Sequence, residues 1–241
     1  MKVSLITASF NSEQFIEDTI ISVINQTFKN IEYIIIDGKS HDNTINIVNR
    51  YKNHIAKIIS EKDNGIYDAM NKGIAIASGD IIGFINSDDF YTDNSVIENI
   101  VKLFLSSNPD ALYADIFYIS RKNKNKIIRH WTTDKYQPNS MTKGWHPPHP
   151  TLFVKKDIYN KYGGFNTKYS LAADFELMLR LFEKYKISSV YYPKPIIKMR
   201  TGGATSKNIS NIIKQNIECL NAFKDNNIEV SPFYPVTRLY S

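Results

Sequence analysis

The sequence contains a single cysteine, Cys219, among its 241 residues, and only ten glycines and nine prolines. One cysteine excludes an internal disulfide and a cysteine metal cluster. No apolar run approaches the roughly 20 residues that a membrane-spanning helix needs. The first residues, MKVSLITASFN, enter a strand pattern at once and lack the cleavage region of a signal peptide. We therefore expect a cytoplasmic protein with one sizeable core.

Positive charge is in excess, with a net charge of +6 and a pI near 9.1. Such a balance suits an anionic partner, whether nucleic acid, a membrane surface or a phosphorylated ligand. Five basic residues and no acid fall within 121–129, which is either a solvated hairpin tip or a functional patch. The range 194–241 has seven basic and three acidic residues, net +4, which suits contact with anionic lipid at the inner face of the cell membrane.

Strand and helix patterns alternate over the first hundred residues. Continuous apolar strand patterns occur at 2–9, 30–38, 55–61 and 80–87, and helical patterns separate them at 12–27, 41–53 and 65–78. Ser12 has the chemistry of a helix cap, and acids follow it in the first turn. This order predicts an α/β fold with a Rossmann-like, mostly parallel central sheet flanked by helices. Ligands of such sheets bind beyond the carboxyl ends of the strands.

Polar side chains follow several of these strands. Thr7, Asp37, Asp63, Asp88 and Asp89 all fall at or just past a strand's carboxyl end. Turn and cap chemistry accounts for one or two of them. It accounts poorly for four converging acids, because unpaired like charges brought together cost energy. A bound cation would remove that cost, so this edge of the sheet is a candidate metal and nucleotide site.

The second half is less regular and reads as a smaller region on the acceptor side. We expect a helix at 95–107 and then a hairpin of strands 110–120 and 126–132. A proline-stiffened loop within 144–165 passes into a short strand and a helix, and an amphipathic helix follows at 172–185. An edge strand broken by prolines at 190–200, a loop at 201–206 and a last helix at about 206–225 complete the chain.

Five segments together resemble, in order and spacing, the family 2 inverting glycosyltransferases with the A-type fold. They are TASFN, DGKSHDNT, EKDNGIYDAMNKG, ASGDIIGFINSDD and AADFELMLRL. The resemblance covers about residues 1–205, which implies one glycosyltransferase domain with a nucleotide-sugar-binding half (1–95) and an acceptor and catalytic half (96–205). Residues 206–241 would then form a C-terminal helix and a basic tail.

The resemblance implies a UDP-sugar donor and Mn²⁺ or Mg²⁺. Carried over by position, it implies that Thr7, Asp37 and Asp63 contact the base and ribose and that Asp88 contacts the ribose. It likewise implies that Asp89 binds the metal, that Asp174 is the catalytic base and that Arg200 belongs to a loop that closes over the donor phosphates. Two departures stand out. Asn86 replaces an acid that many relatives have, and Ala173 replaces a glutamate that often precedes the catalytic aspartate.

Some of these residues have plainer interpretations. Asp174 could be only a helix N-terminal acid that the helix dipole favours. In GWHPPHPT, His146 and His149 could share a metal, although no third ligand is evident, or His149 could contact acceptor or diphosphate. Trp145 could stack on an acceptor sugar or pack in the core. Arg180 is expected to pair with an acid on its own helix.

The sequence thus predicts a metal-dependent inverting glycosyltransferase that moves galactose, glucose or an N-acetylhexosamine to a saccharide acceptor, forming a β-glycosidic bond. Family habit and charge suggest a polyprenyl-diphosphate-linked O-antigen or capsule intermediate as the acceptor. Two rivals are a non-catalytic nucleotide- or sugar-binding module and a sugar-nucleotide pyrophosphorylase, although TASFNSEQF lacks the Gly-rich, basic loop of the latter. Nucleic acid is not expected, because the strand-end acids would repel its phosphates.

Overall fold

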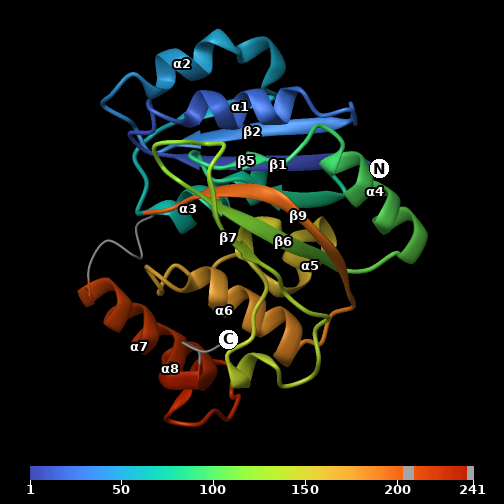
Figure 1. The fold of residues 1–241 in the computed structure, drawn as a ribbon, viewed down its shortest axis with the longest axis vertical. Helices are drawn as coiled ribbons and strands as arrows, with labels where there is room; N and C mark the ends of the chain where they lie inside the picture. The colour runs from blue at the N-terminus through green and yellow to red at the C-terminus, as the bar shows by residue number, and fades with distance from the viewer. Residues whose placement is uncertain (203–208, 238–241) are drawn as a thin grey trace.

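The computed structural model describes residues 1–202 and 209–237. A nine-stranded sheet crosses the molecule, with strand order β3-β2-β1-β4-β8-β6-β9-β5, and β7 pairs with β6 off this path (Figure 1). The strands are β1 (Val3–Ser9), β2 (Ile31–Asp37), β3 (Lys57–Ser60), β4 (Ile81–Phe84), β5 (Phe90–Tyr91), β6 (Ala111–Ile119), β7 (Ile127–Trp131), β8 (Phe153–Lys155) and β9 (Ser189–Arg200).

The first four strands run parallel, as the alternating pattern predicts. The second half of the sheet is mixed, because β8 is antiparallel to both β4 and β6 while β9 is parallel to β6. Pro193 and Pro195 lie where the β6–β9 register shifts. Only Ile197 and Lys198 of β9 pair with β5, so the proline-containing half is a free edge, as expected for residues that cannot donate a backbone hydrogen bond.

Helices cover both faces of the sheet. They are α1 (Ile16–Ile24), α2 (Thr44–Arg50), α3 (Ile66–Ile76), α4 (Val96–Ser107), α5 (Lys156–Tyr162), α6 (Ala173–Leu179), α7 (Ile209–Asp225) and α8 (Tyr234–Thr237). One π-helical turn, Arg180–Lys184, continues α6. Within it Arg180 pairs with Glu176 at 2.9 Å, which confirms the pairing predicted for this arginine.

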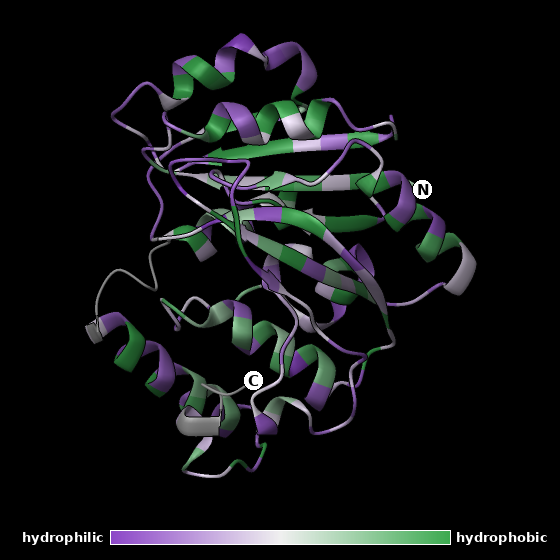
Figure 2. Cartoon of the chain, viewed as in Figure 1, coloured by the Kyte–Doolittle hydropathy of each residue, from purple (hydrophilic) through white to green (hydrophobic). Residues whose placement is uncertain are grey.

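Alternate strand residues feed two separate cores, since successive side chains point to opposite faces of a sheet. In β2, Ile35 belongs to the core that also holds residues of α1, α2 and α4, whereas Ile34 and Ile36 belong to the core that holds residues of α3, α5, α6 and α7. Figure 2 shows mostly hydrophobic strands between helices whose outer surfaces carry hydrophilic residues. No helix within the described ranges is long and apolar enough to cross a membrane.

Two helix ends differ from the expectation. Helix α1 begins at Ile16, not near residue 12, and the Ser12 side chain does not cap it. The Ser12 carbonyl accepts hydrogen bonds from the Phe15 and Ile16 amides, while its hydroxyl lies 2.8 Å from the Ser87 hydroxyl. The helix predicted at about 206–225 is α7, which is described from Ile209. Residues 203–206 of the predicted phosphate loop lie outside the described residues.

Candidate active site

The carboxyl ends of the parallel strands stop at one level and open a cleft. Ser9 of β1 is in register with Asp37 of β2, which is in register with Ser60 of β3. The cleft beside them has a volume of about 740 Å³. We call it the carboxyl-edge cleft. It is lined by Ala8, Ser9, Phe10, Gly38, Lys39, His41, Lys62, Asp63, Gly65, Ile66, Ala69 and Ser87.

The mouth of the carboxyl-edge cleft combines an open aromatic ring with positive charge. Phe10 is 57% exposed, and its ring meets the edge of His41 at a centroid distance of 6.3 Å. Lys39 and Lys62 add two cations to the same lining. A volume of this size, with one flat apolar surface and a few polar groups, suits a nucleotide.

Asp63 holds its predicted place in the cleft, and a glycine makes room for it. Its Oδ1 accepts a hydrogen bond of 2.9 Å from the Gly65 amide. A Cβ added at Gly38 would stand 2.4 Å from Asp63 Oδ2, a separation that atoms cannot adopt. The absence of a side chain at residue 38 therefore fixes where the Asp63 carboxylate lies.

Two other predicted nucleotide contacts point elsewhere. Thr7 is fully buried, with its hydroxyl 3.1 Å from that of Tyr33 on the opposite face of the sheet, so Ala8 and Ser9 line the cleft in its place. Asp37 is also fully buried. Its carboxylate accepts hydrogen bonds from Ser9, Ser40 and Ser60, which tie together the loops that follow the strands. Asp37 therefore shapes the cleft without lining it.

The adjacent acids after β4 have different environments. Asp89 is 1% exposed, accepts hydrogen bonds from Asn86 at 2.9 Å and from the Arg200 amide at 3.1 Å, and lies away from solvent. Burial, and then the charge of Asp88, raises the pKa of Asp89 to about 8. The Asp88 side chain is 29% exposed and follows Ser87 of the cleft lining. Asp88 is thus the more accessible of the two carboxylates, although the sequence predicts the metal at Asp89 and the ribose at Asp88.

Arg200 is a structural residue in this arrangement. Its side chain is 3% exposed, and its guanidinium donates to Asp18 at 2.5 Å and to the Asp88 carbonyl. The same group lies over the rings of Phe15 and Phe90, at 4.5 and 5.0 Å. The predicted contact with donor phosphates does not fit these surroundings, because every face of the guanidinium is already engaged.

Arg121, from the basic patch at 121–129, contacts Asp88 of the strand-end acids. The turn between β6 and β7 folds back over α1, where Lys124 pairs with Asp18 at 2.9 Å (Figure 1). Arg121 pairs with Asp88 at 3.2 Å and lies 4.4 Å above the Phe15 ring. The patch is a hairpin tip, as one interpretation held, but it is docked beside the strand-end acids. The charge pattern of the patch does not indicate where in the fold the hairpin tip lies.

Asp174 stands in the first turn of α6, across from the carboxyl-edge cleft. Its Oδ1 accepts a hydrogen bond of 3.0 Å from the Tyr67 hydroxyl and one of 2.8 Å from the Phe175 amide, which leaves Oδ2 as the oxygen available to a proton. Tyr67 follows Ile66 of the cleft lining on α3. Burial, and then the charge of Asp174, raises the pKa of Tyr67 well above its usual range, so the phenol remains a donor.

The C-terminal helix fixes the backbone that precedes α6. Glu218 of α7 accepts hydrogen bonds from the amides of Ser170, Leu171 and Ala172, at 2.8–3.2 Å. Asn226 donates to Glu176 of α6 at 3.1 Å. The Glu218 carboxylate therefore fixes the three residues that lead into α6.

The two acceptor residues proposed from GWHPPHPT, Trp145 and His149, are partly buried and pack against aromatic rings. Trp145 packs against Tyr113 and Tyr136, and His149 lies between Phe84 and Phe165. The Trp145 indole nitrogen and both His149 nitrogens have no hydrogen-bond partner among the described residues, and burial lowers the pKa of His149. Both rings are thus packed among aromatic neighbours, and His146, which is also half-buried, lies beside Trp131.

The donor set fits a cation that is shared with a phosphorylated ligand. Within 1–202 and 209–237, no three His, Cys, Asp or Glu side chains gather in a way that would hold a metal ion alone. Mg²⁺ and similar cations, however, often bind through one carboxylate together with substrate phosphates and water. Asp88 is such a carboxylate, at the rim of a cleft with nucleotide dimensions.

Comparisons with known proteins agree with this architecture. An uncharacterized glycosyltransferase of Mycobacterium tuberculosis (strain CDC 1551) is 31% identical over 180 residues, which are 74% of this chain and 68% of that protein. Chondroitin synthase of Pasteurella multocida (strain Pm70) is 27% identical over 187 residues, 75% of this chain and 19% of that one.

Solved structures give the same fold at low identity. S. aureus TarS 1–349 in complex with UDP-GlcNAc matches with a TM-score of 0.72 at 16% identity, over 93% of this chain and 73% of that one. The mannosyltransferase PcManGT of Pyrobaculum calidifontis, in complex with GDP-Man and Mn²⁺, matches with a TM-score of 0.67 at 17% identity, over 99% and 68%. The chain spans 40% of another TarS structure.

Fold and cleft together define a glycosyltransferase with the A-type fold. The model of the family described as "Glycosyl transferase family 2" matches residues 4–163, and the chain belongs to that family. The match contains the carboxyl-edge cleft and the strand-end acids but ends before Asp174.

Proposed function

We propose that this protein is a metal-dependent inverting glycosyltransferase that transfers a hexose (galactose, glucose or an N-acetylhexosamine) from a UDP-sugar to a saccharide, with formation of a β-glycosidic bond. The observation that carries this proposal is the hydrogen bond from Tyr67 to Asp174. It joins a carboxylate suited to deprotonate an acceptor to the helix that borders the nucleotide-sized cleft.

The donor side of the proposal rests on the carboxyl-edge cleft. The exposed Phe10 ring offers a surface on which a base can stack. Asp63 can accept hydrogen bonds from the base or ribose, and Lys39 and Lys62 offset the charge of a diphosphate. The structures of TarS with UDP-GlcNAc support a UDP-sugar as donor.

We assign the cation, Mn²⁺ or Mg²⁺, to Asp88. Its half-exposed carboxylate lies next to Ser87 of the cleft, and Arg121 beside it adds a further positive group. When bound, such a cation acts as a Lewis acid that stabilises the charge left on the departing diphosphate. Asp89 supports the turn from below, through its hydrogen bonds to Asn86 and the Arg200 amide.

The reaction then needs one displacement at the anomeric carbon. The acceptor oxygen attacks C1 of the donor sugar as the bond from C1 to the diphosphate oxygen breaks, and Oδ2 of Asp174 takes the acceptor's proton. A general base of this kind is typically worth about 10²–10⁴ in rate. Because attack comes from the face opposite the leaving group, an α-linked donor gives a β-linked product.

For the acceptor we propose a saccharide linked to a polyprenyl diphosphate, an intermediate of a surface polysaccharide such as O-antigen or capsule, met at the inner face of the membrane. Two features support it. The tip of the β6–β7 hairpin presents exposed cations, Lys122 and Lys126 among them. Helix α7 exposes Ile212, Ile213 and Ile217, an apolar surface that suits a lipid interface. A vesicle co-sedimentation assay with and without anionic lipid checks this part on its own.

Calorimetric titration of UDP, with and without Mn²⁺, is the deciding experiment. We expect binding that strengthens with Mn²⁺ in the native protein and loses that gain in Asp88→Asn but less so in Asp89→Asn. A GDP titration checks the base. Binding of UDP without turnover of any UDP-sugar would favour the non-catalytic module, and release of pyrophosphate from a nucleoside triphosphate would favour the pyrophosphorylase.

A further inference from the structure

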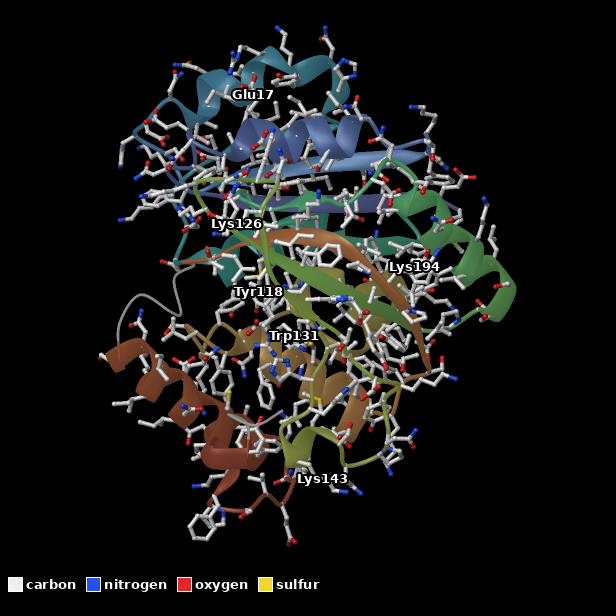
Figure 3. The ribbon with its side chains drawn as sticks, viewed as in Figure 1. Glu17, Tyr118, Lys126, Trp131, Lys143 and Lys194 are labelled. Atoms are coloured by element: carbon white, nitrogen blue, oxygen red, sulfur yellow. The ribbon has the colours of Figure 1, made fainter. Side chains whose placement is uncertain are left out.

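Four aromatic side chains form a continuous row between the strand-end acids and Asp174. The rings of Tyr118 and Trp131 lie parallel, 4° apart, at 6.2 Å. The His146 ring is nearly perpendicular to those of Trp131 and Phe175, with centroid distances of 5.3 and 5.9 Å. We call these four residues the aromatic row. Figure 3 shows Tyr118 and Trp131 side by side on the neighbouring strands β6 and β7.

The two ends of the aromatic row are fixed by the backbone. Tyr118 is opposite Met199 in the β6–β9 register, and the next pair is Ile119 with Arg200. The Arg200 amide donates to Asp89 at 3.1 Å, so this end of the row adjoins the strand-end acids. At the other end Phe175 directly follows Asp174 and donates its amide hydrogen to that carboxylate.

The middle of the row is open to solvent. Tyr118, Trp131 and His146 are each half-buried, whereas Phe175 is buried. Trp131 ends β7, whose only partner strand in the described chain is β6, and the preceding four residues of β7 are exposed. The Trp131 ring is thus in contact with Tyr118 and His146 and remains partly exposed to solvent.

We propose that the Trp131 indole is the platform on which a pyranose ring of the acceptor saccharide stacks. The proposal rests on the proposed function, because it uses the path between leaving group and base. The electron-rich face of an indole attracts the C–H groups on the apolar face of a sugar ring. His146, next to both Trp131 and Phe175, is within the same surface and can exchange hydrogen bonds with sugar hydroxyls.

The chain offers a direct probe, since it has only two tryptophans, Trp131 and Trp145. Their indole N–H signals are resolved in a ¹⁵N-labelled sample and assigned with Trp131→Phe. The native protein, with UDP and Mg²⁺ present, is titrated with methyl β-D-glucopyranoside, methyl β-D-galactopyranoside and methyl N-acetyl-β-D-glucosaminide. Sorbitol, which has hydroxyls but no ring, is the control. We expect at least one glycoside to move the Trp131 signal in a saturable way and to leave Trp145 in place.

A kinetic measurement gives the complementary readout. Release of UDP from the donor is followed as the same glycosides are added. We expect Trp131→Ala to raise the glycoside concentration for half-maximal stimulation about tenfold or more, with a smaller rise for Trp131→Tyr, which keeps an aromatic face. Ile128→Ala, at a 55% exposed position of β7, is the matched control for disturbance of the strand.

The outcomes separate this inference from the proposed function. If UDP binds and no glycoside moves the Trp131 signal, or if Trp131→Ala and Ile128→Ala respond alike, the platform is overturned and the donor site stands. If UDP does not bind to the native protein, both proposals fall together, and the calorimetric result identifies that case.

Discussion

The Tyr67 hydroxyl donates a hydrogen bond of 3.0 Å to Oδ1 of Asp174 and thereby joins α3 to α6. Helix α3 starts at Ile66, in the lining of the carboxyl-edge cleft. The same helix also holds the approach to α6, because Asn71 exchanges two hydrogen bonds of 2.8 Å with the backbone of Phe165. One helix therefore sets the position of the candidate base relative to the nucleotide.

Replacement of Tyr67 by phenylalanine tests this link. A hydrogen bond to a charged group is worth about 1.5–3 kcal/mol, so we expect kcat to fall by about tenfold to a hundredfold while the KM for the donor changes little. Steady-state kinetics with a UDP-sugar measures both. Tyr185→Phe, at an exposed ring, is the control. An unchanged kcat in Tyr67→Phe would mean that the phenol only fills space.

Asp174→Asn keeps the size of the side chain and removes its basicity. We expect transfer to fall by about 10²–10⁴ while calorimetric binding of UDP stays near native. Glu176→Gln is unsuitable as a control, because Glu176 is buried and paired with Arg180. The exposed Asp157→Asn on α5 serves instead. Loss of UDP binding in Asp174→Asn would place its role in the donor site.

Gly38→Ala tests the close approach between Gly38 and Asp63. Because the new methyl group would meet the Asp63 carboxylate at 2.4 Å, the carboxylate must turn away from its present place. We expect the Kd for UDP to rise about tenfold, the equivalent of one hydrogen bond to a charged group. Gly38→Ala combined with Asp63→Ala gives the check. If Asp63 is the group displaced, the double variant binds no worse than Asp63→Ala alone.

Asp89 makes the stability of the fold depend on pH. Its pKa is raised from 3.8 to about 8, so the folded chain holds a proton that the unfolded chain releases. The stabilisation is present in full below the unfolded pKa and is lost as the pH rises to the folded value. Asp89→Asn carries no charge at any pH, so its thermal midpoint should rise relative to that of the native protein as the pH increases from about 4 to about 8. A difference in thermal midpoint that stays constant with pH would contradict this.

Arg200→Met separates a structural role from a phosphate-binding role. The substitution leaves Asp18 and the Asp88 carbonyl without their buried donor. A buried acceptor that loses its donor typically costs about 1–3 kcal/mol, and Asp18 keeps Lys124 as a partner, so we expect a loss of stability within that range in urea unfolding. Lys198→Met, on the same strand, is the control. A stable Arg200→Met variant with weakened UDP binding would restore the role predicted from the sequence.

The fold could be predicted from the sequence because its signals are local. Runs such as IEYIIID report burial on both faces of a parallel sheet, and the helices between them have a period of their own. The mixed pairing of β8 and β9 could not be predicted, since strand partners far apart in the chain are chosen by packing. The carboxyl edge as the site followed from the fold class alone.

Individual site residues were harder, because neighbouring residues of a strand point to opposite faces. An assignment that is wrong by one residue therefore places the side chain on the wrong face of the sheet. Thr7 was predicted to contact the nucleotide, but Ala8 lines the cleft. The pairs Arg121–Asp88 and Tyr67–Asp174 join residues that are distant in sequence, and no local pattern indicates either one.

The hydrogen bonds that Glu218 accepts from the amides before α6 bear on how the chain can be engineered. A shortened version that stops near residue 205, where the resemblance to the family ends, would keep every acid of the site and lose the clamp that orients Asp174. The smallest catalytic unit therefore extends through α7. Chimaeras that exchange C-terminal segments between relatives should carry a carboxylate at this position, or couple the exchange to a redesigned start of α6.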